Sequence, residues 1–237
     1  RRAAKLSVSR KFTRSPISLT RARISFISKI GFSQFGKSIK NTDEDNFRDE
    51  TKTRLLSKEE SSILRYKDTS NSKFGILALL KNITLKVEYG DLIGIVGDTG
   101  SGKTSLLNAI LNNLDILEDF ESNISQIIVN GSVSYVPQTP WIINDTIKEN
   151  ILFNKEYDEE RYKQIISICE LEKDLLSLKR GDFSRVGDKG GGILSNGQKI
   201  RISIARAVYS DSDISLFDDP LSAIEPSTSH HIFHQVI

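Results

Sequence analysis

Apolar residues alternate with polar ones or form short runs along the chain from residue 63 onward. Ile83, Leu85 and Val87 alternate with polar residues, which predicts a half-buried strand. The run Leu92–Val96 is apolar apart from one glycine, which is typical of a fully buried strand in a parallel sheet. Three further short strands are expected, at Ile127–Asn130, Ser132–Val136 and Ile214–Phe217.

Segments with helical composition or spacing alternate with these strands. Helices are expected at Lys103–Leu111, within 158–178, at Gln198–Tyr209, and from Pro226 to Ile237, where proline opens the helix. Strands that alternate with helices are typical of an α/β fold. The one cysteine of the sequence, Cys169, falls in the apolar pattern of 158–178, so we expect a small core residue rather than a nucleophile.

The first 40 residues differ in charge from the rest of the chain. They hold eleven Lys or Arg and no Asp or Glu, which leaves 22 of the 33 basic residues against all 31 acidic residues elsewhere. Because the basic excess lies outside the expected domain, a nucleic-acid-binding function is disfavoured. Within this arm, 17–30 is compatible with a basic amphipathic helix or with a solvated tail. Residues 41–62 are polar and charged, and we interpret them as a linker or disordered insertion.

Composition also bears on the context of the chain. No apolar run approaches the roughly 20 residues that a membrane-spanning helix needs. A single cysteine rules out an internal disulfide. The absence of methionine, even at position 1, favours an internal piece of a longer protein.

The strongest chemical motif is GDTGSGKT at 97–104, which matches G-x-x-x-x-G-K-[ST] between an expected strand and an expected helix. Glycines let the backbone fold around a phosphate, and N–H groups at the helix start bind the anion. Lys103 of such a loop reaches the β- and γ-phosphates, and the Thr104 hydroxyl ligates Mg²⁺. The candidate nucleotide-binding residues of this P-loop are Gly97, Asp98, Thr99, Gly100, Ser101, Gly102, Lys103, Thr104 and Ser105.

A second motif, ISLFDD at 214–219, provides the acidic partner that a P-loop needs. It is a mostly apolar strand that ends in an acid. We therefore expect Asp218 to lie at the carboxyl edge of the sheet and to hold Mg²⁺ there.

Three shorter motifs stand in the order found in ATP-binding-cassette (ABC) ATPases. LSNGQ at 194–198 resembles their LSGGQ signature, with Asn196 in place of the first glycine. YVPQ at 135–138 resembles their Q-loop, and LSAIE at 221–225 resembles their D-loop, with Glu225 where Asp is usual. More specifically, four runs resemble the first nucleotide-binding domain of the C subfamily of ABC transporters, the multidrug-resistance-associated protein type: PWI (140–142), TIKENILF (146–153), ARAVY (205–209) and FDDPLSA (217–223).

The resemblance covers roughly residues 63–237. It implies a P-loop NTPase core with a parallel sheet, an antiparallel β edge subdomain and a helical subdomain that carries the signature, truncated after the D-loop helix. Residues 1–40 would be a juxtamembrane arm, since SLTRARISFIS at 18–28 is similar to the segment that leaves the first transmembrane bundle. The adenine base would stack on an aromatic residue before the P-loop, for which Phe74 is the first candidate and Tyr66 the second.

The same resemblance implies ATP and Mg²⁺ as cofactors, bound between two cassettes. The P-loop, Gln138 and Asp218 would serve one ATP, with Thr104, Gln138 and Asp218 around the Mg²⁺. The signature residues Ser195, Asn196, Gly197 and Gln198 would serve the second ATP in trans. The implied partners are a second nucleotide-binding domain and the transmembrane domains of the same transporter, whose coupling loops would touch the region 139–195. The implied location is the cytoplasmic face of a membrane.

Hydrolysis at this P-loop is expected to be slow. Lys103, Gln138 and Asp219 are the candidate catalytic residues, and Asp219 stands where the family usually has a glutamate base. A base must lie within hydrogen-bond reach of the attacking water, and a displacement of about 1 Å can cost about 10²-fold in rate. Two alternatives remain open: a nucleotide-binding switch of an ABC-type channel with little turnover, and a soluble ABC ATPase.

His230, His231 and His234 invite a zinc interpretation, because His230 and His234 share a helix face. No cysteine or acidic cluster completes a closed site, so we interpret these histidines as part of a surface helix.

Overall fold

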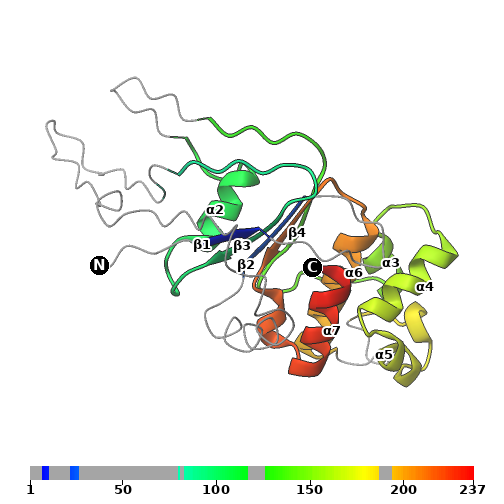
Figure 1. Ribbon diagram of the computed structural model, residues 1–237. Coiled ribbons are helices and arrows are strands. Elements are labelled where there is room, and N and C mark those ends of the chain that lie inside the picture. The colour runs from blue at the N-terminus through cyan, green and yellow to red at the C-terminus, as the bar shows by residue number, and fades with distance from the viewer. Residues whose placement is uncertain (1–6, 11–21, 27–79, 81–82, 117–125, 187–193) are drawn as a thin grey trace, which may run out of the picture.

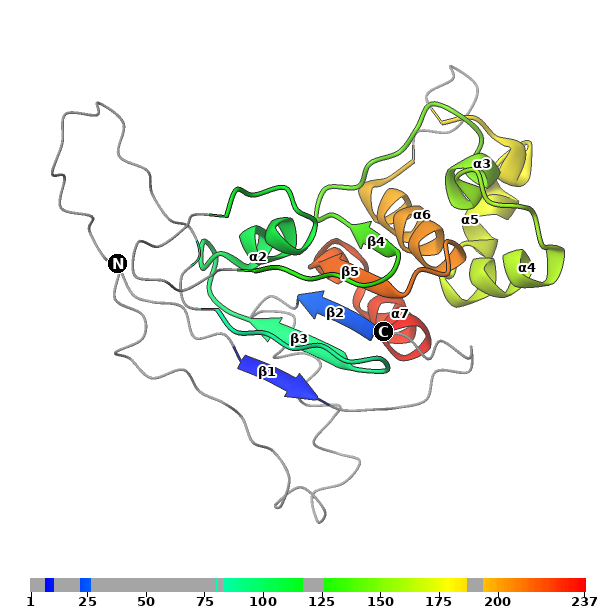
Figure 2. The ribbon, with the colours of Figure 1, turned by 90° about the horizontal axis from the view of Figure 1, so that it is seen from above.

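The computed structural model describes residues 7–10, 22–26, 80, 83–116, 126–186 and 194–237. Within them a five-stranded sheet has the order β1-β3-β2-β5-β4 (Figure 2). Its strands are β1 (Ser7–Arg10), β2 (Ala22–Phe26), β3 (Leu92–Val96), β4 (Val133–Val136) and β5 (Ile214–Asp218). Strands β3, β2, β5 and β4 are mutually parallel, and β1 pairs antiparallel with β3 at one edge. The predicted α/β class with a parallel sheet is confirmed.

Six α-helices are described along with these strands (Figure 1). They are α2 (Lys103–Ile110), α3 (Ile147–Leu152), α4 (Glu159–Ile168), α5 (Glu172–Ser177), α6 (Asn196–Tyr209) and α7 (Pro226–Val236). Short 3-10 turns lie at η1 (Gly181–Phe183) and η2 (Pro220–Ala223). Figure 2 shows α3, α4 and α5 gathered beside the sheet, with α6 between them and the strands. No helix in the described ranges is both long and apolar enough to cross a bilayer.

Two apolar clusters pack against the sheet, one on each face. Successive residues of a strand point to opposite faces. Accordingly, Leu216 of β5 packs with β3 and α2 in the smaller cluster, whereas Phe217 packs with α3, α4, α6 and α7 in the larger one. Both side chains are buried. The helix that follows the P-loop and the helix that follows the signature therefore cover opposite faces of one sheet.

Three sequence expectations about strands are corrected. Segments 83–87 and 127–130 are not strands, although Leu85 and Val87 pack partly buried against the smaller cluster. Strand β3 alternates between buried and half-buried residues instead of being buried throughout. Ile93 and Ile95 belong to the smaller cluster, whereas the larger cluster on the other face includes no residue of β3. Helices α2, α4, α5, α6 and α7 lie where helices were expected.

The interpretation of 17–30 as an amphipathic helix is wrong at residues 22–26. These residues form β2, which pairs with β3 on one side and with β5 on the other. In the sequence ARISF, polar Arg23 and Ser25 alternate with Ala22, Ile24 and Phe26, a period-2 pattern that suits a strand better than a helix. Apart from β1 and β2, the residues of the arm lie outside the described residues, as do the segment 41–62, Tyr66 and Phe74.

Helix α3 was missed as a helix, although its start carries a capping signal. Thr146 precedes it and Glu149 stands three residues later, which is the spacing of a capping box. The Thr146 hydroxyl accepts a hydrogen bond from the Glu149 N–H at 3.0 Å. The helix is only six residues long, so packing against α6 rather than helical periodicity stabilises it.

Cys169 follows α4 in the larger cluster and is fully buried, which confirms it as a core residue. Burial raises the pKa of its thiol to about 12, an effect that the charge of Arg201 only partly offsets. Because the thiolate is the reactive form, we predict that a water-soluble thiol reagent at pH 8 leaves the native protein unlabelled and labels it rapidly in denaturant. A Leu176→Cys variant is the control, because Leu176 is 86% exposed and its replacement should react at once in the native state. Rapid native labelling of the parent protein would contradict this packing.

Candidate nucleotide-binding site

The P-loop connects β3 to α2 through a backbone that only glycine adopts without strain. Gly100 and Gly102 have φ of 78° and 94°, in the left-handed region. Gly102 is the residue that caps α2, and the Ser101 N–H closes a turn onto the Asp98 carbonyl at 3.1 Å. The loop thus turns its backbone toward the positive end of the α2 dipole, which is the arrangement that binds anions.

The Lys103 ammonium lies within this loop. Its Nζ donates to the carbonyl oxygens of Gly97 at 2.8 Å and of Asp98 at 2.9 Å. The Ser101 hydroxyl is buried and has no hydrogen-bond partner within the described ranges. A cationic amine and an unsatisfied hydroxyl in one glycine-rich loop fit the phosphates of a nucleotide.

Thr104 and Asp218, 114 residues apart in sequence, are in direct contact. The Thr104 Oγ1 donates to Asp218 Oδ2 at 2.9 Å and approaches Oδ1 at 3.2 Å. Thr104 is in the first turn of α2, and Asp218 is the last residue of β5, only 4% exposed. A hydroxyl and a carboxylate are the hard oxygen ligands that Mg²⁺ prefers, so the two side chains fit a shared magnesium ion.

Tyr135 is part of this cluster, and the sequence analysis did not single it out. Its hydroxyl donates to Asp218 Oδ2 at 3.3 Å from β4, the strand next to β5. Burial, together with the neighbouring Asp218 carboxylate, raises the pKa of Tyr135 to about 12, so it stays a donor at neutral pH. The signal was available in the motif YVPQ, whose first residue shares the strand that leads to Gln138.

Gln138 and Asp219 follow the carboxyl ends of two adjacent parallel strands. Gln138 comes two residues after β4 and is exposed, and Asp219 comes directly after β5 and is half-buried. Since β3 also ends at this edge and leads into the P-loop, all three elements converge on the edge where open α/β sheets bind ligands. Asp219 has φ 49°, and its carbonyl accepts a hydrogen bond from the Ser222 hydroxyl at 2.8 Å.

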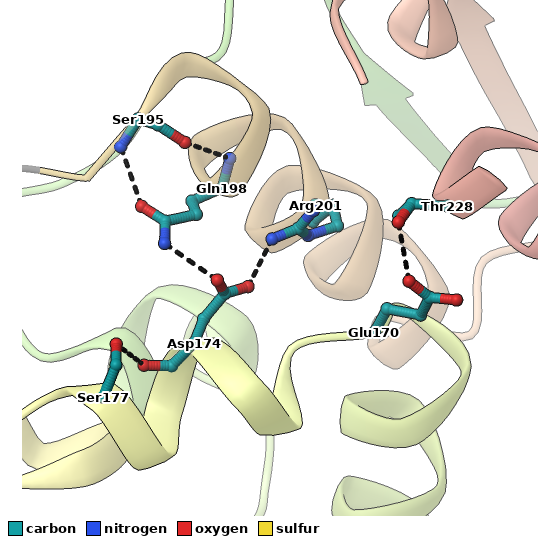
Figure 3. Close-up of polar contacts among 7 residues, drawn as sticks. All are labelled: Glu170, Asp174, Ser177, Ser195, Gln198, Arg201 and Thr228. Atoms are coloured by element: carbon teal, nitrogen blue, oxygen red, sulfur yellow. Dashed lines mark hydrogen bonds and ion pairs between the residues drawn. The ribbon is translucent and has the colours of Figure 1, made fainter. Parts of the chain in front are cut away.

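The signature motif forms the start of α6 (Figure 3). Ser195 caps the helix in a reciprocal arrangement: its hydroxyl accepts from the Gln198 N–H at 3.2 Å, and Gln198 Oε1 accepts from the Ser195 N–H at 2.8 Å. Asn196, which replaces the usual first glycine, is exposed. At the retained Gly197, by contrast, a Cβ would lie 3.3 Å from the Ala223 carbonyl oxygen in the D-loop. The motif therefore tolerates a side chain at position 196 and has little room for one at 197.

An aromatic pair lies on the surface next to the Q-loop. Trp141 is 56% and Phe153 is 44% exposed, and their rings meet edge to face with centroids 5.8 Å apart. The Arg206 guanidinium lies against both rings and donates to the Trp141 carbonyl and to Asn150. Burial lowers the pKa of Arg206. Trp141 and Phe153 together form a surface that we call the aromatic patch. Through these contacts, Arg206 attaches the aromatic patch to helix α6.

The histidines lie on α7 as expected for a surface helix. His230 and His234 are exposed, and their Nε2 atoms are 3.2 Å apart. Throughout the described ranges, no cluster of three or more His, Cys, Asp or Glu could hold a metal ion.

The fold and this edge of the sheet define a P-loop nucleotide-binding domain. Comparison with known proteins agrees: the family model described as "ABC transporter" matches residues 80–222. The chain is 46% identical over 156 residues to ABC transporter C family member 3 of Dictyostelium discoideum, which covers 66% of this chain and 11% of that protein. It is 44% identical over 160 residues to ATP-binding cassette sub-family C member 2 of Mus musculus, covering 68% of this chain and 10% of that protein. It is 44% identical over 158 residues to ATP-binding cassette sub-family C member 4 of Homo sapiens, covering 67% of this chain and 11% of that protein.

The chain belongs to the ABC transporter family, as its signature, Q-loop and D-loop motifs predicted. Domains of this family bind ATP, usually with Mg²⁺, and are generally ATPases. The chain spans about a tenth of the length of the curated relatives that it matches.

The contact between Gly197 and the D-loop leads to a prediction about stability. Replacing a helical glycine by alanine normally stabilises a helix by about 1 kcal/mol. We predict that Gly197→Ala forfeits this gain or destabilises the protein, because its Cβ crowds the Ala223 carbonyl. The matched variant Asn196→Ala, one residue earlier and exposed, should keep or raise the free energy of unfolding measured in urea. A full gain of about 1 kcal/mol for Gly197→Ala would contradict the close approach.

Proposed function

We propose that this chain is the first nucleotide-binding domain of a C-subfamily ABC transporter, which binds MgATP to drive export across a membrane. The observation that carries the proposal is the contact of Thr104 with Asp218 at 2.9 Å, together with the Lys103 ammonium bonded within the preceding loop. The proposed division of the chain is an arm (1–40), a linker (41–62) and the nucleotide-binding domain (63–237), with β1 and β2 of the arm added to the sheet of the domain.

In this proposal the P-loop residues 97–105 hold the phosphates of ATP. Their backbone N–H groups and the Lys103 ammonium neutralise the phosphate charge, and Phe74 is proposed to stack on the adenine. Thr104, Asp218 and Gln138 hold the Mg²⁺, which when bound neutralises charge on the phosphate oxygens. Tyr135 keeps the Asp218 carboxylate oriented toward Thr104.

The signature serves a different ATP, held mainly by a second nucleotide-binding domain. Helices α2 and α6 cover opposite faces of the sheet, so the P-loop and the signature of one chain have separate surroundings. This separation supports a site shared between two domains. Ser195, Asn196, Gly197 and Gln198 would meet the γ-phosphate of the partner domain, where the N-terminus of α6 favours negative charge. ATP then joins the two domains, and their closure moves the transmembrane domains.

The aromatic patch is the proposed contact with the coupling loops of the transmembrane domains. Trp141 and Phe153 belong to the helical region 139–195, directly after the Q-loop residue Gln138. Exposed aromatic side chains beside an arginine are the residues enriched in protein–protein interfaces. Anchored to α6 through Arg206, the patch would transmit motion between the membrane part and the signature helix. The domain would then lie at the cytoplasmic face of a membrane.

A regulatory switch of an ABC-type channel is the second candidate, and Asp219 is the residue that favours it. If Asp219 places its carboxylate too far from the attacking water, the site binds MgATP and hydrolyses it slowly. Both candidates share the same binding site. Single-turnover hydrolysis by the paired domains separates them, because a switch leaves the bound ATP intact.

We predict that Asp219→Glu in the full-length protein raises ATP turnover at this site about tenfold to a hundredfold, because the added methylene brings the carboxylate closer to the water. MgATP affinity should stay unchanged. Asp219→Asn, which removes the base and keeps the size, is the matched control and should not raise turnover. An Asp219→Glu variant with unchanged turnover in single-turnover and steady-state assays would count against the slow-hydrolysis account.

A further inference from the structure

A partly buried polar cluster lies behind the signature motif, on the side of helix α5 (Figure 3). Asp174 of α5 uses both of its carboxylate oxygens there. Its Oδ1 accepts from Gln198 Nε2 at 2.8 Å, and its Oδ2 accepts from Arg201 Nη2. The side chains of Asp174 and Arg201 are 19% and 14% exposed. Both partners of the Asp174 carboxylate belong to the first two turns of α6.

We propose that Asp174 is a positioning residue for the signature motif, which holds Ser195 and Gln198 in the conformation that receives the partner domain's phosphate. This inference rests on the proposed function, because it names what sets the geometry of that same shared site. Asp174 acts through Gln198 and does not itself touch the nucleotide.

The Asp174 carboxylate determines the orientation of the Gln198 amide. Its NH₂ group donates to Asp174, and its oxygen accepts from the Ser195 N–H. A flipped amide would place its oxygen against the Asp174 carboxylate and its NH₂ against the Ser195 N–H, so both contacts would become repulsive. The charge on Asp174 therefore selects one orientation of Gln198, and only that orientation completes the cap of α6.

The completed cap also holds the Ser195 hydroxyl in one direction. The Gln198 N–H donates to the Ser195 hydroxyl, so the hydroxyl oxygen lies at the N-terminus of α6 with a defined direction. The remaining backbone N–H groups of this turn point along the helix axis. Fixing the cap therefore fixes the group of donors available to an incoming anion, which reduces the ordering cost on binding.

The segment that leads into α5, the helix that carries Asp174, is held in place by contacts of its own. Glu170, two residues before α5, accepts a hydrogen bond from the Thr228 hydroxyl of α7 at 2.6 Å. Cys169 and Leu171 on either side of Glu170 are buried in the larger apolar cluster. Glu170, at the corner between α4 and α5, is thus bonded to α7, which follows the D-loop. Asp174 of α5 is bonded to the signature helix α6. Asp174 consequently reaches Gln198 from a fixed support.

Arg201 depends on the same Asp174 carboxylate for its ion pair. Arg201 Nε is buried without a hydrogen-bond partner in the described part of the chain, and Arg201 Nη2 is bonded to Asp174. A buried guanidinium needs an anionic partner. Asp174 is accordingly held between two donors and cannot turn away from Gln198 without leaving Arg201 unpaired.

The test uses the full-length protein and the variants Asp174→Asn and Glu172→Gln. Glu172→Gln is the matched control, since it removes one negative charge from an exposed position of the same helix. We expect Asp174→Asn to raise the ATP concentration for half-maximal nucleotide occlusion at the partner domain's P-loop by about tenfold, the scale of one charge-assisted hydrogen bond. MgATP labelling at this chain's own P-loop should stay at the parent level in Asp174→Asn. In Glu172→Gln, both this labelling and the ATP concentration for half-maximal occlusion should stay at the parent level.

A double-variant comparison separates positioning from general stability. Gln198→Ala removes the link between Asp174 and Ser195, so adding Asp174→Asn to it should produce no further loss at the shared site. Two results would overturn the inference. One is a double variant whose loss of occlusion equals the sum of the two single losses. The other is an ATP concentration for half-maximal occlusion that is the same in Asp174→Asn and Glu172→Gln. If Asp174→Asn does not fold, the pair Asp174→Asn with Arg201→Gln removes both buried charges together and provides the same comparison. Absence of MgATP binding by the parent protein would instead overturn the proposed function.

Discussion

The hydrogen bond between Thr104 and Asp218 is the constraint on which the rest of the site depends. It joins the first turn of α2 to the end of β5, and so it fixes the P-loop against the central part of the sheet. The contact exists because parallel strands bring their carboxyl ends to one edge, where β3 leads into the loop and β5 ends in an acid. Burial of Asp218 and the bond from Tyr135 leave its carboxylate oriented toward the loop.

The second constraint is the division of the sheet into two covered faces. Leu216 and Phe217 are neighbours in sequence, yet one packs beneath α2 and the other beneath α6 and α7. The nucleotide-binding loop is thus attached to one core and the signature to the other. Side-chain networks complete the second core. Arg206 connects α6 to α3 through Asn150 and to the Trp141 carbonyl after the Q-loop, and Asp174 connects α5 to Gln198 and Arg201. In the proposed transporter, these contacts would carry motion from the membrane side to the shared ATP site.

Much of the fold could be predicted from local pattern, and the failures have physical causes. The motif GDTGSGKT and the strand ending in Asp218 predicted the P-loop and its partner, because each is encoded by a contiguous segment. Strand β2 was missed because its alternating pattern spans only five residues, and the strand gains its structure from pairing with β3 and β5. Tyr135 and Asp174 were missed for a related reason: their roles arise from contacts with residues 83 and 24 positions away. No sequence period marks such contacts.

The measurement that tests the central claim most directly is a titration of the protein with ATP, with and without Mg²⁺, on the parent and on Lys103→Ala. The matched control is Lys155→Ala, which removes an exposed lysine outside the P-loop. The account predicts saturable, Mg²⁺-dependent binding in the parent and in Lys155→Ala, and its loss in Lys103→Ala, because Lys103 places its ammonium in the loop. Equal binding by the parent and by Lys103→Ala would contradict the assignment of this loop as the nucleotide site.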